Sequence, residues 1–138
     1  MKNILILCTG NSCRSQIVHG YLSKILKHKA NVYSAGIETH GLNKNAVKSM
    51  ARDGVDISSH TSNNLKEYDK IDFDFIITVC DDANENCPFF PSKKSKRIHK
   101  NFIDPSKIKN SKNIDLDFDI CRDEIKKFSK EFAKTFFN

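Results

Sequence analysis

The sequence predicts an α/β fold in which a four-stranded parallel sheet is flanked by helices. Short apolar runs alternate with longer segments whose apolar residues recur at helical spacing. The first run is apolar throughout, as a strand covered on both faces must be. The length of 138 residues, with 38% hydrophobic and 29% charged residues, is typical of one soluble domain spanning residues 1–138.

The elements can be justified in chain order. Continuous apolar runs predict the strands, and apolar residues three and four apart predict the helices. Gly36 ends the second strand and Gly54 the second helix. The predicted elements are the strand Asn3–Leu7, the helix Ile17–Leu26, the strand Val32–Ala35, the helix Ala46–Ala51, the strand Phe73–Val79, the short strand Arg97–Phe102 and the helix Phe118–Phe132. This alternation favours helices on both faces of the sheet and ligand binding beyond the carboxyl ends of the strands.

Composition limits the classes of function. The net charge is +6, but the lysines are scattered and no nucleic-acid-binding motif is present, so a solvated basic surface is the favoured interpretation. No signal peptide is visible and the apolar start, Ile4–Leu7, is too short to span a membrane, so no membrane association is expected. Five cysteines without an export signal favour a reducing, cytoplasmic location, and their odd number argues against a fully paired disulfide framework. We expect a monomer.

The stretch CTGNSCRS, Cys8–Ser15, lies between the first strand and the first helix. A turn of this kind directs backbone N–H groups inward, and the following helix adds positive charge at its N-terminus. Arg14 presents a planar fork that matches a tetrahedral oxyanion, and Gly10 relieves the backbone where a positive φ is needed. The predicted oxyanion-binding residues are Thr9, Gly10, Asn11, Ser12, Cys13 and Arg14.

Cys8 is the predicted nucleophile of this loop. Positive surroundings lower a cysteine pKa to between about 3.5 and 7.5, so we expect a Cys8 thiolate at neutral pH, with Ser15 donating a further hydrogen bond to the sulfur. The simpler alternative is a buried cysteine packed in a tight turn. A cysteine and an arginine at this spacing are weak evidence alone, but their position between a strand and a helix favours the functional interpretation.

These residues resemble a known family. CTGNSCRSQ looks like the phosphate-binding loop of the low-molecular-weight protein tyrosine phosphatases and of the thioredoxin-coupled arsenate reductases that share their fold. The segments VYSAGIETHG (Val32–Gly41) and DISSHTS (Asp56–Ser62) are closer to the reductases. The resemblance covers nearly the whole chain, is weakest over Ser92–Leu116, and implies a four-stranded parallel sheet flanked by helices.

Two further cysteines separate the two activities, because a reductase must supply two electrons and needs more thiols than a phosphatase. If the first and third strands are neighbours, they lie about 4.8 Å apart, which makes a Cys8–Cys80 disulfide plausible. Cys87 lies seven residues beyond Cys80. If Asp81 caps a helix through this stretch, seven residues rise about 10.5 Å, so a Cys80–Cys87 bond requires the segment to unwind or bulge. The resemblance implies the same movement. Two unrelated thiols are the alternative, and zinc is disfavoured by the spacing.

The predicted general acid is Asp104, which precedes Pro105. Proline restricts the preceding residue to extended conformations, which could direct Asp104 toward the anion. Asp-Pro is common in turns, and it is the resemblance that implies the catalytic role. The family phosphatases usually follow this Asp-Pro with an aromatic residue, whereas Ser106 here favours a small inorganic substrate.

The remaining candidates have simpler interpretations. Cys13 is favoured as a packing residue within the loop, and Cys121 as a core residue of the last helix. Similar reductases bind potassium near the loop, and Asn11 and Ser34 match that pattern. His19 and Asn63 stand where carboxylates are needed, so no metal site is expected.

The resemblance implies reduction of arsenate to arsenite. In this scheme Cys8 attacks arsenic, Cys8–Cys80 and then Cys80–Cys87 disulfides form, and reduced thioredoxin supplies the electrons, with no bound cofactor. The alternative is a phosphatase acting on phosphotyrosine or a small phosphate ester, and weak phosphatase activity is expected in either case. A non-catalytic arsenic or redox sensor is a third possibility, disfavoured because a sensor needs no general acid.

Overall fold

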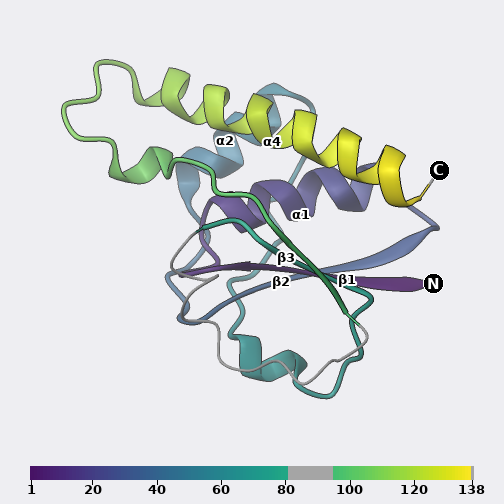
Figure 1. Ribbon diagram of the computed structural model, residues 1–138. Coiled ribbons are helices and arrows are strands. Elements are labelled where there is room, and N and C mark those ends of the chain that lie inside the picture. The colour runs from purple at the N-terminus through teal and green to yellow at the C-terminus, as the bar shows by residue number, and fades with distance from the viewer. Residues whose placement is uncertain (81–94, 138) are drawn as a thin grey trace.

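Four parallel strands form the centre of the molecule (Figure 1). The computed structural model describes residues 1–80 and 95–137. The strands lie in the order β2-β1-β3-β4, with bounds β1 (Lys2–Cys8), β2 (Ala30–Gly36), β3 (Phe75–Thr78) and β4 (Lys96–His99). The four-stranded parallel sheet predicted from the sequence is confirmed, with strand ends shifted by a few residues.

The strand β1 is central because its side chains are apolar on both faces. Residues Ile4–Leu7 have no exposed surface, and β1 pairs with β2 on one side and β3 on the other. Cys8 ends β1, and Cys80 follows β3 by two residues. Because neighbouring parallel strands end at the same edge of a sheet, the two cysteines lie at one edge, as the sequence predicted.

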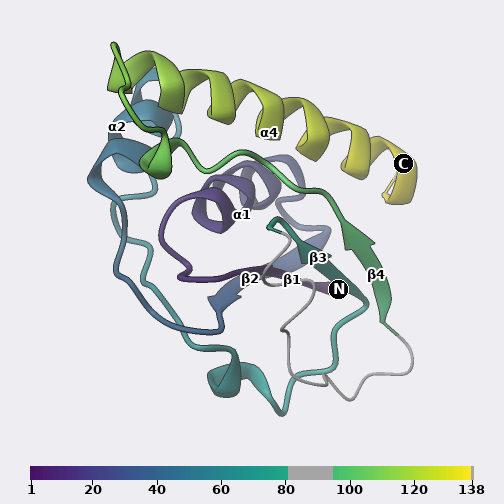
Figure 2. The ribbon, with the colours of Figure 1, turned by 60° about the vertical axis from the view of Figure 1, so that its left-hand side comes forward.

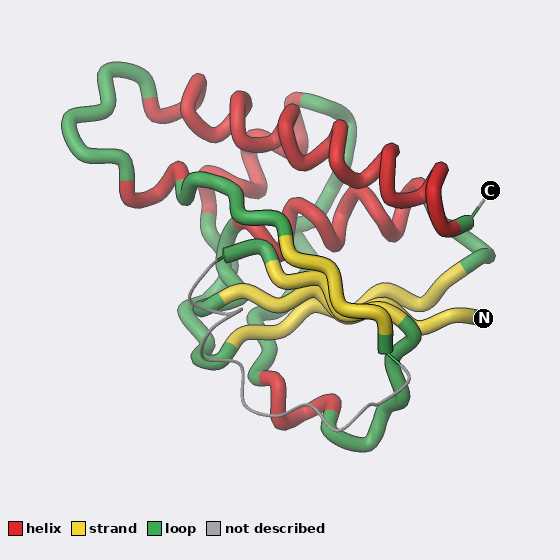
Figure 3. The backbone as a smooth tube through the Cα atoms, in the orientation of Figure 1, coloured by secondary structure: helices red, strands yellow, loops and turns green. Residues whose placement is uncertain are grey.

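Within the described residues, three α-helices lie on one face of the sheet (Figures 1 and 3). They are α1 (Arg14–Ile25), α2 (Lys44–Arg52) and α4 (Ile114–Phe136). The α4 helix packs against α1 and α2 and forms the outer layer (Figure 2). Its buried stripe is made of Phe118, Cys121, Ile125 and Phe132.

The opposite face of the sheet is covered, in the described part of the chain, by a segment containing the short 3-10 helix η1 (Leu65–Tyr68). Tyr33 of β2 packs edge-on against Tyr68 and Phe73, with ring centroids 5.2 and 5.5 Å apart. The alternating pattern predicted helices on both faces. In the described residues no α-helix lies on this face, because α4 directs its apolar stripe toward α1 and α2.

Asparagine side chains fix the starts of two helices. Asn43 Oδ1 accepts from the amides of Asn45 and Ala46, at 2.8 and 3.1 Å, and so begins α2. Asn113 Oδ1 accepts from the Leu116 amide at 3.0 Å. This cap satisfies backbone N–H groups that have no helical partner, so α4 begins at Ile114, ahead of the predicted Phe118.

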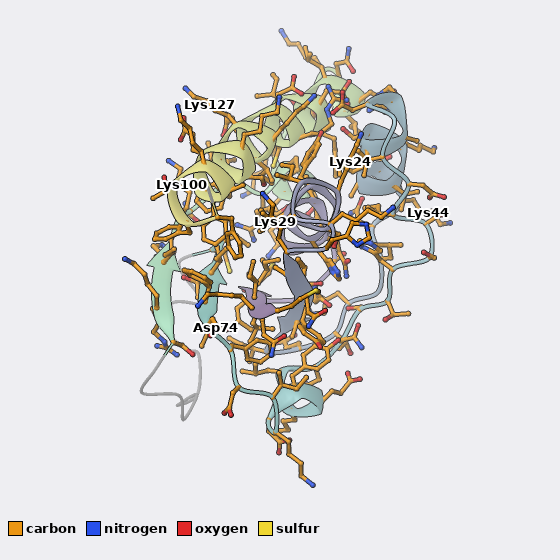
Figure 4. All side chains as sticks on the ribbon, turned by 90° about the vertical axis from the view of Figure 1, so that its right-hand side faces the viewer. Lys24, Lys29, Lys44, Asp74, Lys100 and Lys127 are labelled. Atoms are coloured by element: carbon orange, nitrogen blue, oxygen red, sulfur yellow. The ribbon has the colours of Figure 1, made fainter. Side chains whose placement is uncertain are left out.

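The basic residues are spread over the surface. The exposed lysines labelled in Figure 4 come from different parts of the chain: Lys24, Lys29, Lys44, Lys100 and Lys127. This distribution agrees with the solvated basic surface inferred from the sequence. No helix in residues 1–80 and 95–137 combines the length and apolar character needed to cross a membrane.

Candidate active site

The loop between β1 and α1 is held from outside through its carbonyl groups. Amides of the segment 37–43 donate to loop carbonyls over 2.9 to 3.4 Å, and the acceptors are Cys8, Thr9, Gly10 and Ser12. The side chain of Gln16 donates to the Asn11 carbonyl at 3.0 Å. A trans peptide directs its N–H away from its carbonyl, so the loop amides turn away from these neighbours. The Gly10 amide is directed at the Cys8 sulfur.

Asn11, and not Gly10, has the left-handed backbone of the loop, with φ of 47°. Asparagine tolerates this region better than most residues. Gly10 is needed for another reason, because a Cβ at this position would lie 2.3 Å from Nδ1 of His40. The prediction that Gly10 supplies a positive φ is therefore wrong. The glycine makes room for an imidazole ring from a distant segment.

Ser15 is fully buried, and its hydroxyl oxygen accepts a hydrogen bond from Asn11 Nδ2 at 2.8 Å. Asn11 Oδ1 in turn accepts from the Asn63 amide at 2.7 Å. Among the described residues, Ser15 contacts Asn11 rather than Cys8, so the predicted bond from Ser15 to the sulfur is absent. Ser15 thus holds the strained Asn11 and shapes the loop.

Cys8 and Cys80 lie in contact at this edge of the sheet. They are 4% and 3% exposed, and their side chains share a hydrogen bond. Thr9 Oγ1 lies 3.3 Å from Cys80 Sγ, and either atom could be the donor. The pairing of β1 with β3 that the sequence argument assumed is confirmed. This contact brings together the two sulfurs that a disulfide would join.

The pKa of the Cys8 thiol is raised above its ordinary value. The hydrogen bond with Cys80 is the largest cause, followed by burial, while the Arg14 charge and the Gly10 amide lower it. The predicted lowering is therefore wrong for this state of the site. The positive groups are present, but Cys80 and the exclusion of water outweigh them.

Arg14 lies between the loop and the segment that follows β4. Its Nη1 donates to the Phe102 carbonyl at 2.9 Å, and its Nη2 lies 3.4 Å from Asp104 Oδ2. Its Nε is buried and has no acceptor within the described residues. A buried donor without a partner is costly, and an oxyanion is the kind of acceptor that would satisfy it.

Asp104 faces the loop in the extended conformation that Pro105 imposes, with φ of −73° and ψ of 110°. Its Oδ1 accepts from the amide and the hydroxyl of Ser106, at 2.9 and 2.6 Å, and begins the 3-10 helix η2 (Pro105–Lys107). The contact with Arg14 places this carboxyl beside the loop, where the sequence analysis expected it.

A cavity of about 80 Å³ opens at the loop, and its lining includes Cys8, Arg14, His40, Asp104 and Lys107. Drug-sized ligands occupy pockets of about 300–1,000 Å³, so this space suits a small ion. A larger cavity of about 380 Å³, beside Phe102 and α4, is lined by charged and aromatic side chains and no cysteine.

Two cavity residues were missed at the sequence level: His40 and Lys107. The signal for His40 was available, because the residues after Gly36 must lie at the same sheet edge as those after Cys8. Its contact with Glu38, at 2.6 Å between Nε2 and Oε2, could not be read from spacing.

Near the loop, the side chains considered for a cation site bond to one another. His19 Nδ1 lies 2.8 Å from Ser34 Oγ, and the rings of His19 and His60 are 4.4 Å apart. Burial and the neighbouring His60 lower the pKa of His19 to about 4, so its ring is neutral at pH 7. In the part of the chain described, no group of three or more His, Cys, Asp or Glu is arranged to hold a metal.

Of the remaining cysteines, two are buried and the third lies outside the described residues. Cys13 and Cys121 are each 5% exposed and belong to the hydrophobic core, as the packing interpretation predicted. Burial raises the pKa of Cys13, and that of Cys121 to about 12. Cys87 lies outside the described residues.

Comparison with known proteins identifies the family of this chain. Residues 3–137 match the family described as low molecular weight phosphotyrosine protein phosphatase. Arsenate reductase 1 of Staphylococcus epidermidis is 46% identical over 132 residues, covering 96% of both chains. The arsenate reductase of Bacillus licheniformis is 47% identical over 135 residues, covering 97% of this chain and 96% of that one.

Solved structures agree on the fold. An arsenate reductase in its oxidized state has a TM-score of 0.81 at 24% identity and covers 98% of both chains. A tyrosine phosphatase of Erwinia amylovora has a TM-score of 0.80 at 21% identity, covering 97% of this chain and 92% of that one. The chain therefore belongs to the low-molecular-weight phosphotyrosine protein phosphatase family, and its curated relatives at 46–47% identity are named arsenate reductases.

Proposed function

We propose that this protein reduces arsenate to arsenite at Cys8. The observation that supports reduction over simple hydrolysis is the contact between the Cys8 and Cys80 thiols beside an anion-sized cavity. Hydrolysis of a phosphate ester needs one nucleophilic thiol, whereas reduction of arsenate needs two electrons from a pair. The names of the relatives at 46–47% identity support the same choice.

Binding uses groups that are already in place. The loop amides, the Nε of Arg14, which has no acceptor among residues 1–80 and 95–137, and the nearby Lys107 are all donors or positive charges around the cavity. The bound dianion also offers an acceptor for the Cys8 proton. Because the pKa of Cys8 is raised in the structure, we infer that the thiol passes its proton to an arsenate oxygen as it becomes the nucleophile.

In the first covalent step, the Cys8 sulfur forms a bond to arsenic and an oxygen leaves. Asp104, in its protonated form, gives its proton to that oxygen, which departs as water. The carboxyl is close to the loop through Arg14, at 3.4 Å. Arsenic is still in its +5 state after this step, because no electrons have been transferred.

In the second step, Cys80 attacks the Cys8 sulfur. A sulfur–sulfur bond forms, the arsenic–sulfur bond breaks, and its electron pair stays on arsenic, which leaves as arsenite. The attacking sulfur must be a thiolate, and a hydrogen bond donated by Thr9 Oγ1 at 3.3 Å would stabilise that form. Cys87 then attacks Cys80 and frees Cys8, and thioredoxin reduces the Cys80–Cys87 disulfide.

A phosphatase is the second candidate, because the family and a neighbour with a TM-score of 0.80 include tyrosine phosphatases. The loop, Arg14 and Asp104 would serve a phosphate ester equally well. We therefore also propose a weak side activity of this kind.

The deciding experiment measures NADPH consumption with arsenate, thioredoxin and thioredoxin reductase. Arsenate-dependent consumption is expected, and omission of thioredoxin should stop it. Hydrolysis of p-nitrophenyl phosphate without any arsenate-dependent consumption would instead identify the protein as a phosphatase.

A further inference from the structure

His40 lies against the anion loop, with its side chain 52% exposed. Its backbone N–H donates to the Gly10 carbonyl at 3.0 Å, and its Nε2 lies 2.6 Å from Glu38 Oε2. The ring occupies the space that a side chain on Gly10 would fill, with Nδ1 2.3 Å from the position of a Cβ. His40 thus lines the cavity together with Cys8 and Arg14.

The partner of Nε2 determines what Nδ1 can do. An ionised carboxylate only accepts hydrogen bonds, so in the contact with Glu38 the proton is on Nε2. In a neutral imidazole the other nitrogen then has a free lone pair. In that neutral form Nδ1, the ring atom nearest Gly10, is a hydrogen-bond acceptor beside the loop.

The charged and backbone groups around this cavity are mostly donors, and the hydroxyls of Thr9, Ser12 and Ser106 can donate or accept. Arg14, Lys107 and the loop amides are donors, and Asp104 already accepts from Ser106 and contacts Arg14. Donors bind every tetrahedral oxyanion alike, whether or not the anion has a proton. An acceptor is different, because it attracts a hydroxyl and repels a bare anionic oxygen, and so distinguishes ligands that are otherwise equal in shape and charge.

We propose that His40 is a specificity-determining residue of this cavity. Its Nδ1 accepts a hydrogen bond from the hydroxyl of a protonated oxyanion, and so favours hydrogen arsenate and hydrogen phosphate over sulfate, which has no proton at neutral pH. The inference rests on the proposed function, since it assigns selectivity to the site where arsenate would react. Glu38 acts as a positioning residue by keeping the proton on Nε2.

The test compares inorganic phosphate with sulfate, so it needs no turnover. Dissociation constants are measured by calorimetry on the full chain at mildly alkaline pH and matched ionic strength. Wild-type protein should prefer phosphate, and His40→Ala should reduce the ratio of the two affinities about tenfold, mainly by weakening phosphate. His40→Asn keeps a side-chain oxygen near the Nδ1 position and should retain part of the preference.

His28→Asn is the matched control, because His28 lies before β2, at the far end of that strand from Gly36. It should leave both constants unchanged. Equal weakening of phosphate and sulfate by His40→Ala, or a wild type that reduces arsenate without preferring phosphate, would overturn the inference and leave the proposed function intact. Wild-type protein that binds neither phosphate nor sulfate would overturn both the inference about His40 and the proposed function.

Discussion

At the scale of single residues, the chemistry of the site depends on the order in which two neighbouring thiols lose their protons. Cys8 and Cys80 share a hydrogen bond, which is the largest cause of the raised pKa of Cys8. Arg14 and the Gly10 amide favour the Cys8 thiolate, whereas Cys80 and burial oppose it. An anion that accepts the Cys8 proton would change this balance at the moment of reaction.

Replacement of the nucleophile should abolish every activity of the site. In Cys8→Ser the hydroxyl cannot replace the thiol at arsenic or phosphorus, so arsenate reduction and p-nitrophenyl phosphate hydrolysis should both fall below detection. Cys121→Ser, in the buried stripe of α4, is the control and should retain activity if it folds. Turnover in Cys8→Ser would place the nucleophile elsewhere.

The second thiol should separate the two activities. Cys80→Ser should stop multiple-turnover arsenate reduction, because no disulfide with Cys8 can form, yet leave phosphate-ester hydrolysis within about an order of magnitude of wild type. Cys87→Ser should behave in the same way. The two assays are run on the same preparations, and thioredoxin-dependent turnover that survives in both variants would rule out the relay.

At the scale of elements, one carboxylate joins α2 to α4. Asp119 Oδ1 accepts from Ser49 Oγ and Arg52 Nη2, both at 2.6 Å, and from Arg122 Nη1 at 3.2 Å. The hydrogen bond with Arg52 is the main reason that the pKa of Asp119 is lowered. Because the loop leads directly into α1, and α4 packs on α1, this contact supports the helix layer behind the site.

Asp119→Asn should lower the free energy of unfolding by about 1–2 kcal/mol, because a charge-assisted bond between two helices is lost. Asp123→Asn is the control, since that carboxylate is 63% exposed and bonds only Arg122 in the described chain. It should change stability by less than about 0.5 kcal/mol. Urea titration measures both variants.

The pH dependence gives a second check on Asp119. A carboxyl whose folded pKa is lowered stabilises the protein above its unfolded pKa, near 3.8, and loses that contribution as the pH falls through the folded pKa. The difference between wild type and Asp119→Asn should therefore shrink in acid. A difference that stays constant down to acid pH would mean that Asp119 acts through packing alone.

At the scale of the whole molecule, a buried neutral histidine makes folding sensitive to mild acid. His19 connects α1 to β2 through Ser34 and packs on His60, and its pKa is lowered from 6.5 to about 4. Between these values the unfolded chain binds more protons than the folded one. The stabilisation is complete above pH 6.5 and is lost as the pH falls toward 4.

His19→Asn should make the protein less sensitive to acid over this range. The wild type should lose up to roughly 3 kcal/mol through His19, at about 1.4 kcal/mol for each unit of the pKa difference. His60 acts in the same direction, so the variant should keep part of the slope. Thermal or urea unfolding at several pH values measures it, and an unchanged slope would show that His19 is not the titrating group.

Local patterns in the sequence predicted the parts of the site that depend on chain order. The loop Cys8–Arg14 stands at the junction of β1 and α1, and Cys80 lies at the same sheet edge. Asp104 is extended before Pro105 and contacts Arg14. The position of the loop follows from apolar periodicity and the extended Asp104 from the proline restriction, which act over a few residues, whereas the catalytic role of Asp104 was implied by the resemblance and the adjacency of β1 and β3 was an assumption.

Other features were decided by tertiary contacts. The sequence by itself determined the order of the elements, the position of the loop and the identity of its nucleophile candidate. Only the tertiary structure decided that Gly10 makes room for His40, that Ser15 bonds Asn11 rather than sulfur, and that the pKa of Cys8 is raised. The physical reason is that burial and hydrogen-bond partners come from residues far apart in the chain, such as Cys80 beside Cys8. The opposing effects of these groups on the pKa of Cys8 in a buried site cannot be predicted from the spacing of residues in the sequence.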